Sequence, residues 1–169
     1  MNELLSKISS YHLFNYLLPG SLFAVVATAL THRQFVQQSL VLGLFVYYFY
    51  GLILSRVGSL FVEPFLKWVR FLKFADYRDF VAACKKDAKI DELSETNNMY
   101  RTLCTLLIVL MLLEAIVLLE LKYSELKRAE LPVLVPIVFG LLLFSYRKQT
   151  GYITKRVNAN VESQDTPQS

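Results

Sequence analysis

Glu114 is the side chain whose chemistry is hardest to explain by packing alone. It stands in the middle of an apolar run, LLIVLMLLEAIVLLEL, that fills residues 106–121. A carboxylate in the middle of a bilayer costs a few kcal/mol, so Glu114 should face protein or water instead of acyl chains. Two interpretations stay open: a protonated or paired carboxyl group that bonds to a neighbouring helix, or a group that lines a pore or binds protons.

Tyrosines gather in the apolar run 35–54. Tyr47, Tyr48 and Tyr50 lie too deep in that run for all three hydroxyl groups to reach the membrane interface. Buried hydroxyl groups need hydrogen-bond partners, which indicates packed or water-lined surroundings. Tyr47 and Tyr50 therefore join Glu114 as candidate pore-lining or gating residues.

Residue patterns typical of catalysis are missing from the sequence. His12 and His32 lie near opposite ends of the first apolar run, so they cannot share a metal ion. The sequence contains no H-E-x-x-H, no G-x-S-x-G, no Gly-rich phosphate loop and no pair of carboxylates at helical spacing within an apolar run. We therefore expect no enzyme activity, no cofactor and no metal site.

The composition indicates a membrane protein. The chain of 169 residues is 54% hydrophobic and only 19% charged, with a mean hydropathy of +0.40, whereas soluble domains average about 45–50% apolar and about 25% charged residues. Because lipid offers free backbone groups no partner, each apolar run long enough to cross it must be a helix. Four runs are candidates: 13–30, 35–54, 103–121 and 131–146.

For two of these runs a straight transmembrane helix is not the only interpretation. The first ends in Ala27-Thr28-Ala29, which would also suit the cleavage site of a signal peptide, although Lys7 alone makes a weak basic region before it. The last is short and holds Pro132 and Pro136, so it is predicted to be bent or to span thinly. The predicted fold class is an all-α membrane protein with four transmembrane helices and a helical cytoplasmic segment, 58–101, between the second and third.

Lys and Arg set the expected orientation of these helices. Fourteen of them lie in segment 1–12, in the stretch between the second and third runs, and in the tail 147–169, against four in the two other connections. By the positive-inside rule, both termini and segment 58–101 are expected to be cytoplasmic. Cys84 and Cys104 lack a C-x-x-C spacing, which agrees with a reduced compartment.

Amphipathic patterns predict helices outside the spans. One lies in segment 1–12, a second covers 60–74, and a third begins at Asp76, which is placed to cap it. The end of the tail, from Asn158, is polar and is expected to be disordered. Acidic neighbours favour a solvated face around Lys85 and Lys86. The candidates for contact with a cytoplasmic ligand or partner are Arg56, Lys67, Arg70, Lys85, Lys86 and Arg101.

Small residues recur at multiples of four along the second run. Such a row lets two helices approach closely, either within one subunit, which is the simpler explanation, or between subunits. The residues predicted to pack in this way are Ser39, Gly43, Gly51 and Ser55.

Short motifs lie next to three of the runs. SRVGSL at 55–60 and EPF at 63–65 follow the second run, NNMYRT at 97–102 opens the third, and YRKQ at 146–149 and KR at 155–156 follow the fourth. Together they resemble small bacterial four-span membrane effectors of anti-phage operons, and in particular the Hailong-type channel effectors. The resemblance implies a channel in the bacterial inner membrane. It also implies a nucleotidyltransferase as partner, with the oligonucleotide product of that enzyme controlling the channel.

Two functions of different classes follow from these observations. The first is a homo-oligomeric ion channel or pore-forming effector, gated through the cytoplasmic segment, because four spans are too few to surround a pore within one chain. The second is a non-conducting membrane anchor or adaptor that recruits a soluble partner. Conductance in a reconstituted bilayer separates them.

Overall fold

The computed structural model describes residues 13–31, 33–122 and 126–162. Every regular element in these ranges is a helix, which confirms the all-α prediction. The expected amphipathic segment 1–12 and the end of the tail, 163–169, lie outside the described residues, as do the side chains of residues 121–132.

The first two long helices cross at close range. The π-helix η1 (Leu13–Leu17) leads into α2 (Leu18–Thr31), and both pack against α3 (Leu40–Val57). A Cβ atom on Gly20 would lie 1.7 Å from the backbone oxygen of Tyr47, and one on Gly51 would lie 1.8 Å from that of Tyr16. Two residues without side chains therefore permit this crossing.

The helix that starts with α3 continues through η2 (Gly58–Val62) into α4 (Glu63–Trp68). The sequence predicts a span from residue 35 and an amphipathic helix as far as Phe74, and both limits are wrong. Residues 33–39 are not helical, since Ser39 caps the start of α3, and α4 ends at Trp68. Just beyond it Arg70 adopts a φ of 60°, a left-handed conformation through which a helix does not continue.

Three further helices complete the chain: α5 (Tyr77–Lys86), α6 (Lys89–Lys122) and α7 (Leu126–Glu162). Asp76 caps α5 as predicted, its side chain accepting a hydrogen bond from the Arg78 backbone N–H at 2.8 Å. α6 and α7 are much longer than the apolar runs within them. α7 continues through both of its prolines and includes residues 158–162, which the sequence wrongly predicts to be disordered.

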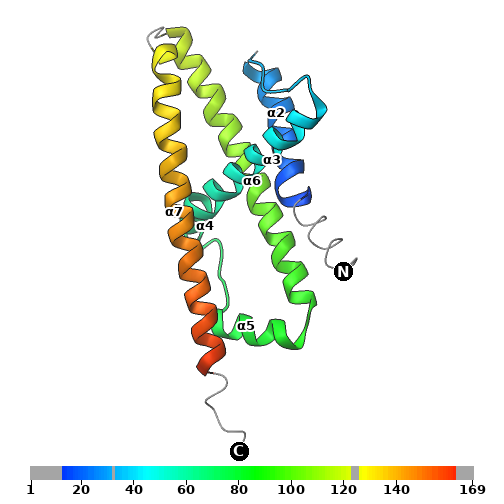
Figure 1. Cartoon of the computed structure of the whole chain (residues 1–169). Helices are drawn as coiled ribbons and strands as arrows, with labels where there is room; N and C mark the ends of the chain where they lie inside the picture. Colours follow the sequence, from blue (N-terminus) through cyan, green and yellow to red (C-terminus); the bar gives the residue numbers. More distant parts are fainter. Residues whose placement is uncertain (1–12, 32, 123–125, 163–169) are drawn as a thin grey trace, which may run out of the picture.

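The long helices alternate in direction (Figure 1). α6 and α7 meet at one end of the molecule and separate toward the other, where α5 lies between them and contacts both. We call this second end the α5 end. The core packs between α2, α3 and α6 and consists of Phe23, Ala27, Leu54, Leu106 and Leu110. At the opposite end buried Glu120 forms an ion pair with Arg33, which ties the α2–α3 connection to α6.

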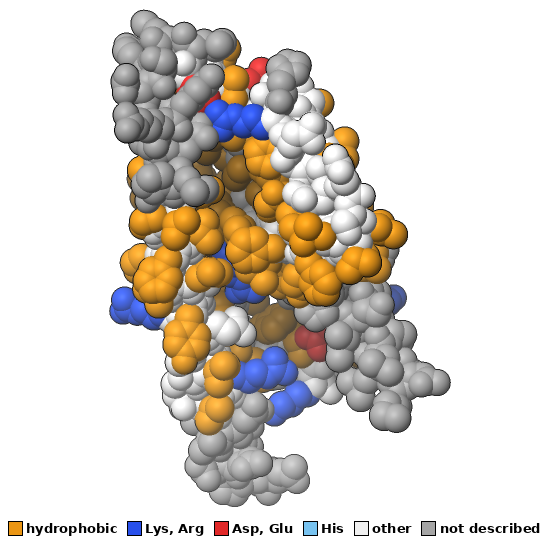
Figure 2. Space-filling model, turned by 45° about the horizontal axis from the view of Figure 1, so that its top comes forward, with side chains coloured by type: hydrophobic (Ala, Val, Ile, Leu, Met, Phe, Trp, Pro, Cys, Tyr) orange, Lys and Arg blue, Asp and Glu red, His pale blue; other side chains and the backbone are white. Residues whose placement is uncertain are grey.

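Much of the apolar surface is left uncovered by the chain itself. Two helical stretches are long and apolar enough to cross a membrane, Leu40–Trp68 and Lys89–Glu120, and only 22% of the apolar window of each is buried. The first run forms a shorter apolar helix, Asn15–Thr31. Most large apolar side chains of α7 between Val133 and Phe144 are exposed, although Leu141 is buried. Figure 2 shows apolar side chains as a band across the molecule, with most of the visible Lys and Arg side chains along or below its lower edge and one above the band.

Candidate functional site: a basic pocket at the α5 end

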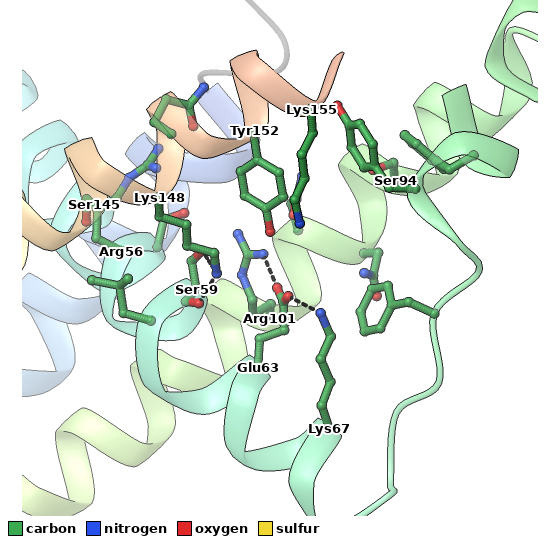
Figure 3. Close-up of a pocket in the computed structure, with 18 of the residues that line it drawn as sticks. Arg56, Ser59, Glu63, Lys67, Ser94, Arg101, Ser145, Lys148, Tyr152 and Lys155 are labelled. Atoms are coloured by element: carbon green, nitrogen blue, oxygen red, sulfur yellow. Dashed lines mark hydrogen bonds and ion pairs between the residues drawn. The ribbon is translucent and has the colours of Figure 1, made fainter. Parts of the chain in front are cut away.

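A polar cavity of about 480 Å³ lies at the α5 end, and we call it the basic pocket. One wall is the junction between η2 and α4, with Ser59 and Glu63. A second wall is the first part of α6, with Arg101, and a third is the polar half of α7, with Lys148 and Lys155. Figure 3 shows these side chains converging from separate helices. Residues of the segment that leads into α5 also line the cavity.

Cations dominate the pocket. Of the six basic residues that the sequence singles out, Arg56, Lys67 and Arg101 line it. The other three, Arg70, Lys85 and Lys86, are exposed residues that do not line the cavity. Lys148 and Lys155 were missed, because in the sequence they stand out only as charges of the tail. Their spacing with Ser145, Gln149 and Tyr152 follows one face of a helix, which is the signal that could have identified them.

Glu63 is the carboxylate at the centre of the pocket wall. Its Oε1 atom accepts from Lys67 Nζ at 2.8 Å and its Oε2 atom accepts from Arg101 Nη1 at 2.7 Å. The residue is 7% exposed, so two cations stabilise a carboxylate that water hardly reaches. Lys67 also stacks on the ring of Phe74, with Nζ 4.1 Å from the ring centroid.

The π-helix η2 frees a backbone acceptor in the pocket wall. The Glu63 backbone N–H donates to Gly58 O, as π-helical pairing requires, and the next residue, Pro64, has no N–H to offer Ser59 O. Lys148 of α7 supplies the missing donor: its Nζ atom donates to Ser59 O and also to Ser59 Oγ at 2.9 Å. This interaction joins α7 to the α3–α4 helix.

Burial lowers the pKa of Lys148, and the cations Arg101, Lys67 and Arg56 lower it further, although Glu63 acts in the opposite direction. The pocket therefore holds more positive charge than its own carboxylate neutralises. An arrangement of this kind is suited to bind an anion.

The candidate pore residues lie elsewhere. Glu114 is exposed on α6, and within the described residues no hydrogen bond or ion pair reaches its carboxylate. The hydroxyl group of Tyr47 accepts a hydrogen bond from the Gln37 backbone N–H at 3.0 Å. Tyr50 packs edge-to-face on Phe23 and Phe35 at the border of the core.

The four small residues of the second run have different surroundings in the structure. Gly51 contacts the backbone of Tyr16 within the chain, while Gly43 is buried beside the ring of Tyr47. Ser55 is buried at the edge of the basic pocket. Ser39, predicted to pack against a helix, is instead exposed, and its hydroxyl group accepts from Leu42 N as the cap of α3.

No family model, curated protein or solved structure matches the chain. The resemblance to Hailong-type effectors, with the nucleotidyltransferase and oligonucleotide that it implies, stays a prediction from short motifs. Residues of each of these motifs nevertheless line the basic pocket, among them Arg56, Glu63, Arg101, Lys148 and Lys155.

Proposed function

We propose that this chain is the subunit of a homo-oligomeric channel or pore in a bacterial inner membrane. The apolar parts of α2, α3, α6 and α7 are its four spans, and both termini and the α5 end are cytoplasmic. The gate responds to an anion in the basic pocket.

Exposure of the apolar helices supports the membrane placement. Soluble proteins rarely leave large contiguous apolar surfaces in water, whereas α3, α6 and α7 expose most of theirs. The positive-inside rule supports the orientation, because the basic pocket and most Lys and Arg residues fall at the same end.

Glu114 supports assembly into oligomers. Its carboxylate lies on the uncovered surface of α6, where a lipid environment would cost free energy. A second copy of the chain, or a water-filled space between copies, would remove that cost, and a cyclic assembly would place the same helix around one axis. A channel would require such an arrangement, because a single chain has too few helices to surround a pore.

The single observation that carries the gating proposal is the composition of the pocket wall. Three of the helices that contribute apolar spans, α3 through η2, α6 and α7, extend into this one cavity. An anion that changes how their cationic side chains pair would change the spacing of these helices and hence the packing of the spans.

Reconstitution tests this proposal. Purified protein in liposomes is expected to release entrapped potassium ions and to migrate in mild detergent as an assembly heavier than one 19.5 kDa chain. A monomeric mass together with intact ion gradients at high protein density would overturn it.

The orientation predicts opposite labelling of two exposed positions. In a chain whose own cysteines are replaced (Cys84→Ser, Cys104→Ser), we expect Gln38→Cys to react with a membrane-impermeant thiol reagent in intact spheroplasts. Glu95→Cys should react only after the membrane is permeabilised, because it lies in the part of α6 near the α5 end, which we propose to be cytoplasmic. The reverse pattern would invert the proposed orientation.

Glu114→Gln is expected to assemble normally but to alter ion selectivity, because glutamine keeps the shape and hydrogen bonding of the side chain while removing its charge. Glu114→Leu serves as the comparison, since it removes both. Reversal potentials in planar bilayers measure the effect. Unchanged selectivity in a well-assembled glutamine variant would leave Glu114 with a structural role only.

An aromatic ridge favours the second candidate function, a non-conducting anchor. Phe61, Phe65, Trp68 and Phe71 are all strongly exposed around α4. Such residues suit the membrane interface, and they would equally suit the apolar surface of a recruited protein. Oligomers without ion flux would favour this function over the channel.

A further inference from the structure

We infer that the basic pocket binds a phosphate group carried by a larger organic molecule, and that Glu63 is the internal anion that this group replaces. The inference names the chemistry of the anion in the proposed function. It rests on that function only for the claim that binding changes the gate. Charge, donor geometry and size each contribute to the argument.

Charge is the first argument. Five cations and one carboxylate line the cavity, so positive charge exceeds negative by four. Glu63 forms ion pairs with two of these cations, whereas the other three form no ion pair with an acidic group of the described residues. Those three are Arg56, Lys148 and Lys155. Cations held this close together repel one another, and a ligand with two negative charges relieves more of that repulsion than a single carboxylate does.

The donors are arranged for an oxyanion. Arg101 uses Nη1 on Glu63, while its Nε atom is buried without a hydrogen-bond partner among the described residues. A buried donor without a partner costs free energy, and the guanidinium fork matches two phosphate oxygens. In Figure 3 the side chains of Lys148, Tyr152 and Lys155 descend from α7 toward Arg101 and Glu63. They would supply further donors to the same group.

Glu63 holds the place that the phosphate would take. Its two oxygens accept from cations of α4 and α6, but no cation of α7 pairs with it in the described structure. A phosphate group has more acceptor sites and more charge, so it can engage α6 and α7 together. Lys148 would then donate its hydrogen bonds to the ligand instead of to Ser59. This change would release the contact between α7 and the α3–α4 helix.

The volume of the cavity indicates more than an ion. About 480 Å³ falls within the range of small-molecule sites. Phe74, Tyr77 and Phe80 also line the cavity and offer an apolar surface to the organic part. The phosphate could belong to a lipid headgroup, since the apolar parts of three helices end nearby, or to a soluble phosphoester.

Thermal unfolding of the full-length protein in a nonionic detergent tests the inference. Inorganic phosphate represents the soluble source, and mixed micelles of phosphatidylglycerol, compared with phosphatidylcholine, represent the lipid source. Potassium chloride at equal ionic strength is the blank. We expect a saturable rise of the unfolding midpoint with one or both phosphate ligands.

Paired variants locate the binding. Lys148→Ala is expected to weaken the apparent affinity about tenfold, the loss of one charge-assisted hydrogen bond, whereas Arg147→Ala, an exposed neighbour outside the pocket, leaves it unchanged. If Lys148→Ala does not fold, Lys155→Ala takes its place. Glu63→Gln is expected to bind more tightly than the unmodified chain, because it removes the competing anion.

The outcomes are distinct. A response to inorganic phosphate assigns a soluble phosphoester, and a response to phosphatidylglycerol alone assigns a lipid. No stabilisation by either ligand, or equal effects of the Lys148 and Arg147 variants, overturns the inference. Protein that binds phosphate but conducts no ions retains this inference and loses the proposed channel, while protein that conducts without binding does the reverse.

Discussion

Replacing Gly51 with alanine is expected to lower the free energy of unfolding by about 3 kcal/mol or more, or to prevent folding altogether. The new Cβ atom would lie 1.8 Å from Tyr16 O and 2.5 Å from Tyr16 C, both backbone atoms that cannot rotate away. η1, which carries Tyr16, would have to separate from α3. The core cluster that spans α2, α3 and α6 would then lose contacts as well.

Gly151→Ala provides the matched control for this substitution. It makes the same chemical change within a helix, but a Cβ atom there has no neighbour within 4 Å in the described structure. Alanine should stabilise that exposed helical position by about 0.5–1 kcal/mol. Thermal unfolding in detergent compares the two. Equal midpoints would show that η1 and α3 do not cross at Gly51.

Glu63→Gln is expected to produce the second largest loss, about 1–4 kcal/mol. The substitution leaves the cations of the basic pocket without their carboxylate. The loss is smaller than for a fully buried pair, because the side chain of Arg101 is 19% exposed and that of Lys67 is 43% exposed. Added phosphate should restore part of the lost stability.

Glu92→Gln is the control for Glu63→Gln. Glu92 is exposed on α6 outside the pocket, so its neutralisation should change stability by less than about 0.5 kcal/mol. Unfolding midpoints measured with and without phosphate compare the two variants. A Glu63→Gln protein as stable as the Glu92→Gln protein would mean that Glu63 does not hold the pocket together.

The sequence predicts where the apolar helices lie but not where they end. An apolar run marks the part of a helix that avoids water, and polar helix-forming residues then extend α6 back to Lys89 and α7 on to Glu162. The start of α5 after Asp76 was predictable, because a capping side chain acts on residues next to it in the chain. The π-helix at Gly58 was not, since its freed carbonyl group is satisfied by Lys148, 89 residues away.

The basic pocket could be predicted only in part for the same reason. Arg56 and Lys67 belong to one continuous helical stretch, and Arg101 stands just before an apolar run, so local patterns single them out. Lys148 and Lys155 become part of the site only because α7 returns to the α5 end after reversing direction. The pairing of Glu63 with Lys67 has an i,i+4 signature in the sequence, but its second partner, Arg101, lies 38 residues away.

The central claim is that the basic pocket controls ion passage, and potassium flux from proteoliposomes tests it most directly. Lys148→Ala removes the donor that joins α7 to Ser59, so it should release the resting arrangement and raise the basal flux several-fold. Arg147→Ala loses the same charge one position away, outside the pocket, and should match the unmodified chain. The same flux from both variants, at equal protein density and equal oligomeric mass, would contradict the claim.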